Sequence, residues 1–192
     1  MWAKVESGSV TEVYTRPKQL TIGNTQYPRN IFQLWSSSEL EVIGIYEVEV
    51  NNTNLKDQGY YNNTSQTFTF GSGKVTASYG SAAAKSLTDT SETVDGITTT
   101  ILGLKSVHKS NVNSTASTLL QEHDWMSIRE AEGGTDIPSN IKTWRAAVRT
   151  KANSMCTQID NAANVDALAA LYVYNSDDPP VRPLGEWPSE PS

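Results

Sequence analysis

Six apolar residues recur at helical spacing near the C-terminal end of the chain, and they constrain its fold more than any other feature. They are Ile141, Trp144, Val148, Ala152, Met155 and Ile159. Steps of three or four residues place all six on one face of a helix. Pro138 and Ser139 open this helix. The sequence therefore predicts a long helix that buries this stripe against a second element.

The expected partner is a helix that ends at the Gly133-Gly134 pair. Ser114 or Thr115 is placed to cap its first turn. Its apolar face is formed by Ala116, Leu119, Leu120, His123 and Met126. Two such helices joined by a short connection predict a helical hairpin. A short third helix is expected over 165–174, starting at Asn164 or Asp166.

The first half of the chain has the periodicity of β-strands. Residues 2–6 and 10–15 flank a turn and predict one hairpin, and 67–79 predict a second. Residues 45–50 alternate apolar with polar side chains, as a strand does. Ser36 followed by Glu39 predicts a capping box for a short helix that stops at Gly44.

These patterns predict an α+β protein in four parts. The parts are a small antiparallel β-rich domain (1–80), a Thr/Ser-rich linker with at most a short strand or hairpin at 93–101 (81–113), a helical hairpin module (114–174) and an extended Pro-rich arm (175–192). The arm holds five of the eight prolines, so no packed element is expected there.

Composition excludes several classes of function. The formal net charge of −6 argues against nucleic acid as a partner, because phosphate binding needs clustered Lys and Arg. No apolar run is long enough to insert into a membrane. The N-terminus lacks a signal-peptide pattern, so a cytoplasmic origin is expected. With Cys156 as the one cysteine, no intrachain disulfide or cysteine-based zinc site can form.

Two segments contain residues of catalytic type. The stretch GSGK at 71–74 lacks the earlier glycine of a phosphate loop, where Phe68 stands, and the following Ser or Thr, where Val75 stands. A hairpin turn is the better interpretation. His123 and Asp124 are neighbours on one helix and point in different directions, without a second cluster opposite. We therefore predict no catalytic residue, cofactor or metal ligand, and an inert Cys156 thiol.

Aromatic and charged residues of the second half favour binding instead. The expected partner-binding residues are Trp125, Trp144, Trp187 and Pro183, with Trp187 as an anchor in the Pro-rich arm. The expected structural charge network across the hairpin consists of Asp124, Arg129, Arg145 and Arg149.

The same residues carry a resemblance. The pattern LL…HDWM.IREAEGG..IPS.I.TWRAAVRTKAN over 119–153 resembles the C-terminal helical module of many tailed-phage tail proteins, including fibre-assembly chaperones and small tail proteins of marine phages. The matching positions are Leu119, Leu120, Asp124, Trp125, Arg129, Pro138, Trp144, Arg145 and Arg149. Residues 1–50 also look like the head of such proteins.

The resemblance implies a non-enzymatic protein of the phage tail, assembled in the host cytoplasm and located in the virion. Its partners would be other tail or fibre proteins, and a homo-oligomer is expected. The Thr/Ser-rich middle and the Pro-rich end depart from short chaperones, which favours a structural or fibre-attachment subunit over an assembly chaperone. A carbohydrate-binding module, using Tyr46, Tyr60, Tyr61 and Tyr79, and an envelope hydrolase are the remaining alternatives.

Overall fold

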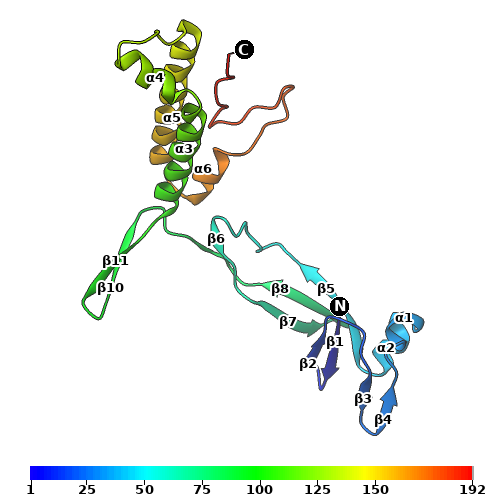
Figure 1. Ribbon diagram of the computed structural model, residues 1–192. Helices are drawn as coiled ribbons and strands as arrows, with labels where there is room; N and C mark the ends of the chain where they lie inside the picture. Colours follow the sequence, from blue (N-terminus) through cyan, green and yellow to red (C-terminus); the bar gives the residue numbers. More distant parts are fainter. Residues whose placement is uncertain (192) are drawn as a thin grey trace. The chain divides into compact units, whose positions relative to one another are not determined.

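The protein divides into two compact units, residues 1–83 and the part of the chain from residue 84 onward. The computed structural model describes residues 1–191 (Figure 1). Strands predominate over helices in the first unit and helices over strands in the second, which confirms the predicted α+β class. The expected linker 81–113 is not a separate part, because residues 84–113 contribute a hairpin and the first part of a long helix to the second unit.

A five-stranded sheet forms the centre of the first unit. Its strands, in spatial order, are β2 (Ser9–Tyr14), β1 (Trp2–Glu6), β5 (Ile45–Asn51), β8 (Lys74–Tyr79) and β7 (Gln66–Gly71). All neighbours are antiparallel except β5 and β8, which are parallel. Strand β7 runs in the direction opposite to β5. Strand β8 follows β7 through a hairpin turn and lies between β5 and β7, so it is parallel to β5.

The β7–β8 turn explains the GSGK stretch. Ser72 and Gly73 have φ values of 51° and 76°, the left-handed backbone of a two-residue hairpin turn. Gly71 and Lys74 face each other as the closing pair of the two strands. The segment is thus a hairpin turn, as the sequence predicts, and its lysine forms an ion pair with Glu49 at 2.7 Å.

Apolar clusters lie on both faces of the sheet. One cluster contains Ala3, Val48, Val75 and Ala77. The other joins the sheet to β3 (Leu20–Ile22), α1 (Ile31–Leu34) and α2 (Ser37–Val42), and contains Tyr14, Leu20, Ile31, Phe32, Leu40 and Ile45. Strand β4 (Thr25–Tyr27) pairs with β3. The remaining short strands are β6 (Tyr61–Asn62) and β9 (Ala83–Ala84).

The predicted capping box opens α2. The Ser36 hydroxyl accepts a hydrogen bond from the Glu39 N–H at 3.3 Å, and the Glu39 carboxylate accepts from the Ser36 N–H at 2.7 Å. Gly44 follows the helix with φ 79°, and a side chain there would lie 2.9 Å from the Val5 carbonyl oxygen. Both predicted boundaries of this helix are therefore confirmed.

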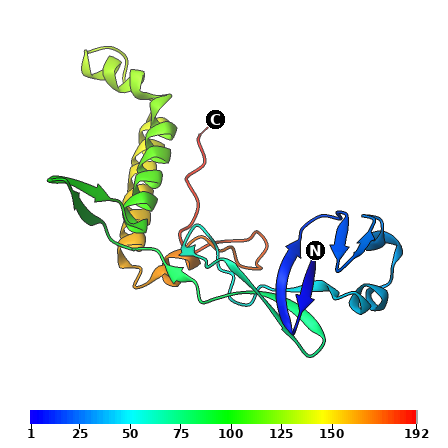
Figure 2. The ribbon, with the colours of Figure 1, turned by 90° about the horizontal axis from the view of Figure 1, so that it is seen from below.

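The second unit begins with the hairpin of β10 (Thr90–Val94) and β11 (Ile97–Ile101), joined by a turn at Asp95 and Gly96. This hairpin agrees with the one expected at 93–101, although it starts earlier. All ten of its strand residues are exposed. Within its unit, the hairpin projects away from the helices (Figure 2).

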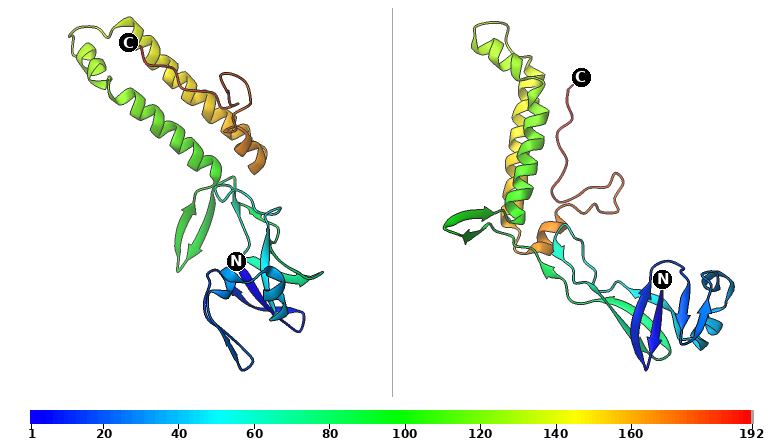
Figure 3. Two further views of the ribbon diagram at one scale, coloured as in Figure 1. Left: turned by 90° about the vertical axis from the view of Figure 1, so that its right-hand side faces the viewer. Right: turned by 60° about the horizontal axis from the view of Figure 1, so that its bottom comes forward.

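Four helices follow: α3 (Leu104–Gln121), α4 (Asp124–Ala131), α5 (Ser139–Asn161) and α6 (Val165–Ala170). Helices α3 and α5 lie side by side as the predicted hairpin (Figure 3). All six residues of the predicted stripe on α5 are buried. Gly133 has φ 82°, and the N–H of Gly134 bonds to the carbonyl of Arg129, which ends α4 as expected.

The expected start of the first long helix was wrong. Helix α3 begins at Leu104, and Thr115 lies in its interior, where its hydroxyl donates to the Asn111 carbonyl at 3.0 Å. This internal bond satisfies the hydroxyl without ending the helix. The expected single helix up to the glycine pair is also broken at Glu122 and His123, so α4 is a separate element.

The Pro-rich segment is extended, without a helix or strand over 171–191, but it is not free. Leu184 is only 2% exposed, and its N–H bonds to the Leu171 carbonyl at 3.0 Å. The segment then runs alongside α5 (Figure 3). The expectation of an unpacked arm is therefore wrong, because one leucine among the prolines finds a buried place on the helices.

Candidate interaction site

The break between α3 and α4 is held by Arg145 of α5. The guanidinium donates to the Leu120 carbonyl at 2.6 Å and to the Asp124 carboxylate at 2.7 Å. Leu120 belongs to the last turn of α3, where carbonyls lack helical partners, and Asp124 belongs to the first turn of α4. Arg145 is 7% exposed, so this buried cation fixes the joint between the two helices.

His123 lies at the same joint and is buried. Its ring packs edge-on against Trp144, with centroids 5.6 Å apart and an interplanar angle of 84°. Its Nε2 atom is 2.7 Å from a carboxylate oxygen of Glu190, near the end of the arm. The Nδ1 atom is buried without a hydrogen-bond partner among residues 1–191. His123 therefore connects the helical joint to the arm.

Trp144 of α5 also contacts the arm. Its indole N–H donates to the Pro188 carbonyl at 3.1 Å. Trp187 is half-buried and lines a cavity of about 280 Å³ together with His108, Val112 and Met155 of the helices. Trp187 thus lies near its own helices, and its expected role as an anchor on another chain stays a prediction. Pro183 remains exposed.

Helix α4 presents the main apolar surface of this region. It has no buried residue, and Trp125 and Ile128 are 54% and 59% exposed. They lie three positions apart and so share one face of the helix. The Arg129 guanidinium lies 4.9 Å from the centre of the Trp125 ring. We call Trp125, Ile128 and Arg129 the α4 surface.

The expected charge network is smaller than the sequence suggests. Arg129 donates to the Thr135 and Asp136 carbonyls of the loop after α4, at 3.0 and 3.4 Å, instead of pairing with Asp124. Arg149 is exposed on α5, and the structure of residues 1–191 contains no hydrogen bond or ion pair from it. Only Asp124 and Arg145 of the four residues are brought together.

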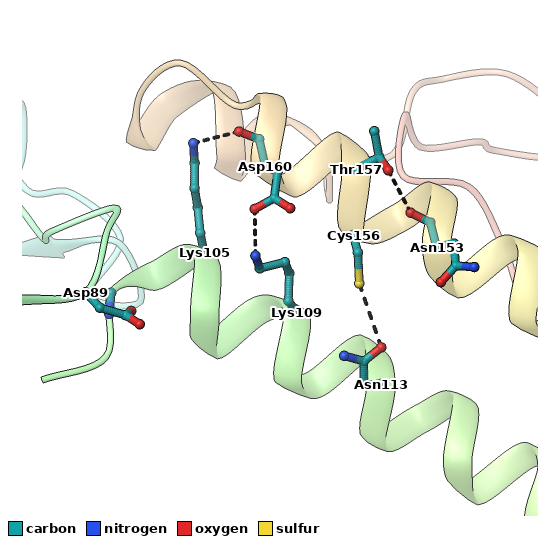
Figure 4. Close-up of polar contacts among 9 residues, drawn as sticks. Asp89, Lys105, Lys109, Asn113, Asn153, Cys156, Thr157 and Asp160 are labelled. Atoms are coloured by element: carbon teal, nitrogen blue, oxygen red, sulfur yellow. Dashed lines mark hydrogen bonds and ion pairs between the residues drawn. The ribbon is translucent and has the colours of Figure 1, made fainter. Parts of the chain in front are cut away.

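Cys156 lies in a polar seam between α3 and α5. Figure 4 shows its sulfur facing Asn113 at 3.8 Å, next to the ion pair of Lys109 with Asp160 at 2.7 Å. Burial raises the pKa of the Cys156 thiol, and the Asp160 charge raises it further against the opposing effect of Lys109. A thiol of raised pKa is a poor nucleophile at neutral pH.

His108 of α3 and Tyr172, which follows α6, form a part-buried polar contact. His108 Nδ1 is 2.7 Å from the Tyr172 hydroxyl, and burial lowers the pKa of this histidine. Over residues 1–191, no group of three His, Cys, Asp or Glu side chains could hold a metal ion. No helix in that range is long and apolar enough to span a membrane.

Sequence reasoning missed the contacts that hold the arm. Leu184, Pro188 and Glu190 are separated from their helical partners by long stretches of chain, and a proline-rich composition gave no signal of packing. The isolated Leu184 within that composition is the one clue available in the sequence.

Comparison of the chain with protein-family models, curated proteins and solved structures finds no match. The α4 surface and the arm contacts are therefore interpreted from their geometry and from the sequence pattern alone.

Proposed function

We propose that this chain is a non-enzymatic protein of a phage tail, built into the tail as a structural or fibre-attachment subunit through protein–protein contacts. The observation that carries the binding role is the α4 surface. Tryptophan and arginine are among the residue types most enriched at the hot spots of protein interfaces. The tail assignment itself rests on the resemblance of residues 119–153.

The contacts around α4 support a rigid display of this surface. The Arg145 guanidinium holds the first turn of α4 through Asp124. Arg129 holds the loop after α4 through two carbonyls and orients the Trp125 ring. A helix fixed at both ends loses little conformational freedom when a partner covers it, which favours affinity.

The decisive experiment is quantitative mass spectrometry of purified phage particles that carry the wild-type chain. Presence in a constant ratio to a known tail protein supports the proposal. Absence from the particles contradicts it; absence combined with loss of fibres on gene deletion would indicate the assembly chaperone instead.

The α4 surface is tested with Trp125→Ala in the same particles. Truncating an interface tryptophan costs about 2 kcal/mol or more, so incorporation should fall more than tenfold. Val42→Ala, at an exposed apolar residue of the first unit, is the matched control and should be incorporated normally. Equal incorporation of both variants would exclude the α4 surface as the contact.

A further inference from the structure

The β10–β11 hairpin lacks the packing that stabilises such elements in water. A two-stranded hairpin alone is marginally stable and normally needs a further strand or a helix against it. Here all ten strand residues are exposed, and Val94, Ile97 and Ile101 are 59%, 70% and 51% exposed. The hairpin thus carries an uncovered apolar face and two open edges within the described chain.

The two faces of the hairpin differ in chemistry. The cross-strand pairs Val94–Ile97, Glu92–Thr99 and Thr90–Ile101 share one face because side chains alternate along each strand. The other face carries only hydroxyl side chains, and Thr93 and Thr98 are hydrogen-bonded there at 2.9 Å. The three large aliphatic residues therefore gather on one side.

The base of the hairpin is firmly held. The Asp89 carboxylate accepts a hydrogen bond from the Gly103 N–H at 2.8 Å, which joins the two ends of the hairpin. This bond lowers the pKa of Asp89, so the carboxylate is ionised at neutral pH. A side chain at Gly103 would lie 2.3 Å from the Thr88 carbonyl carbon. The hairpin is presented on a fixed support and is not a frayed loop.

The turn determines which backbone groups are free. In a two-residue hairpin the flanking pair, Val94 and Ile97, is hydrogen-bonded, and the pattern then alternates. The N–H and C=O groups of Thr98 and Thr100 consequently point away from β10. Both groups stand on the open edge of β11, spaced as a further antiparallel strand requires.

The sequence of β11, Ile-Thr-Thr-Thr-Ile, is the same in both directions about Thr99. Antiparallel pairing with a second copy about a two-fold axis at Thr99 sets Thr98 against Thr100 and Ile97 against Ile101. In this register the outward-facing N–H and C=O groups of Thr98 and Thr100 form hydrogen bonds with those of the second copy. The apolar faces of the two hairpins then lie on the same side of the combined sheet. A two-fold contact requires this kind of self-complementarity.

The edge of β10 is protected against the same pairing. If two copies paired through β10 about a two-fold axis at its middle residue, Glu92 of one copy would lie opposite Glu92 of the other. Like charges directly opposite each other are destabilising. Charged side chains are a common protection of exposed sheet edges. Of the two edges of this hairpin, β11 is thus the one open to a second copy.

We propose that β11 is a self-association edge, where two copies of this chain pair through Ile97–Ile101 into a four-stranded antiparallel sheet. The paired strands span five residues each, so the dimer is concentration-dependent. This inference is independent of the phage-tail proposal, because it concerns a second copy of the chain and can be tested on the purified protein.

The first test compares Thr98→Pro with Thr93→Pro by sedimentation velocity over a concentration series. Proline removes one outward-facing N–H in each case, and the two residues face each other across the hairpin. A symmetric dimer loses two hydrogen bonds with Thr98→Pro, which should weaken it about tenfold. Thr93→Pro should associate like the wild type. Equal effects of both variants, or a wild type that stays monomeric throughout, would overturn the proposal.

The register is tested by oxidative cross-linking of T99C and E92C, each in a C156S background. In the proposed dimer the two Thr99 positions form a non-hydrogen-bonded pair with Cα atoms about 4.5 Å apart, within disulfide range. T99C should therefore form a covalent dimer much faster than E92C. Equal rates would exclude the β11 register, and a faster reaction of E92C would assign the contact to β10.

Discussion

The guanidinium of Arg145 reaches across the α3–α4 joint and forms an ion pair with Asp124 at 2.7 Å. The arginine side chain is 8% exposed and the aspartate side chain 55% exposed, so the pair spans the boundary between core and solvent. The buried cation also bonds the Leu120 carbonyl, which leaves the carboxylate as its only anionic partner among the described residues. Loss of that partner would leave a poorly compensated charge in the interior.

Asp124→Ala should lower the stability of the helical unit by about 1–2 kcal/mol, because a buried charge then loses its anionic partner. The estimate is kept low because the aspartate is partly solvated. Thermal unfolding followed by circular dichroism measures the effect, and Glu122→Gln, a neighbouring exposed carboxylate, is the control. An unchanged melting temperature for Asp124→Ala would refute the structural role of the pair.

Leu184→Ala should release the C-terminal segment. Leu184 is almost fully buried, and truncating a buried leucine costs about 2–5 kcal/mol. Hydrogen exchange of the amides over 184–191 should accelerate, while α5 keeps most of its protection. Val181→Ala, at a half-exposed position of the same segment, should leave exchange unchanged. Equal exchange in both variants would show that Leu184 does not hold the arm.

The helical unit should lose stability on mild acidification. Burial lowers the pKa of His108 in the folded state, so the unfolded chain binds more protons below its own pKa of about 6.5. Stability is then fully present above that pH and declines as the pH falls through it. Denaturant unfolding of wild type and His108→Gln between about pH 7.5 and pH 5.5 measures this slope. The variant should show a shallower decline; identical slopes would assign the effect elsewhere.

Ser36→Ala should cost the first unit about 1 kcal/mol, because the Glu39 N–H then loses its capping acceptor. Chemical denaturation of the purified protein measures the loss. Ser38→Ala, inside the same helix and also exposed, should be neutral or slightly stabilising because alanine favours helix. A larger loss from Ser38→Ala would contradict the capping assignment.

Local sequence patterns correctly predicted the helices and turns whose boundaries are set by residues within the element or next to it. The α5 stripe, the Ser36–Glu39 capping box and the turn at Ser72-Gly73 follow from spacing and backbone preference, which act within a few residues. The start of α3 was predicted wrongly because its position does not follow from local residues alone. Thr115 can either cap a helix or bond within one, and packing along α5 favours the second state.

For the candidate site too, the sequence predicted the local grouping of residues but not the contacts between distant parts of the chain. The sequence placed Trp125, Arg129, Asp124 and Arg145 in one region, since all belong to the two helices next to one loop. It could not show that Trp187 lies near its own helices, nor that Trp144 and His123 bond to the arm. Those contacts join residues far apart in the chain, and their free energy depends on burial.

By itself, the sequence determined the α+β class, the two helices that form the hairpin and the turns between strands, because these depend on short-range periodicity and turn chemistry. Tertiary structure alone decided three features: the parallel pairing of β5 with β8, the docking of the Pro-rich segment and the uncovered edge of β11. Each depends on which surfaces remain available after the cores are filled, and the order of residues in one segment does not encode this.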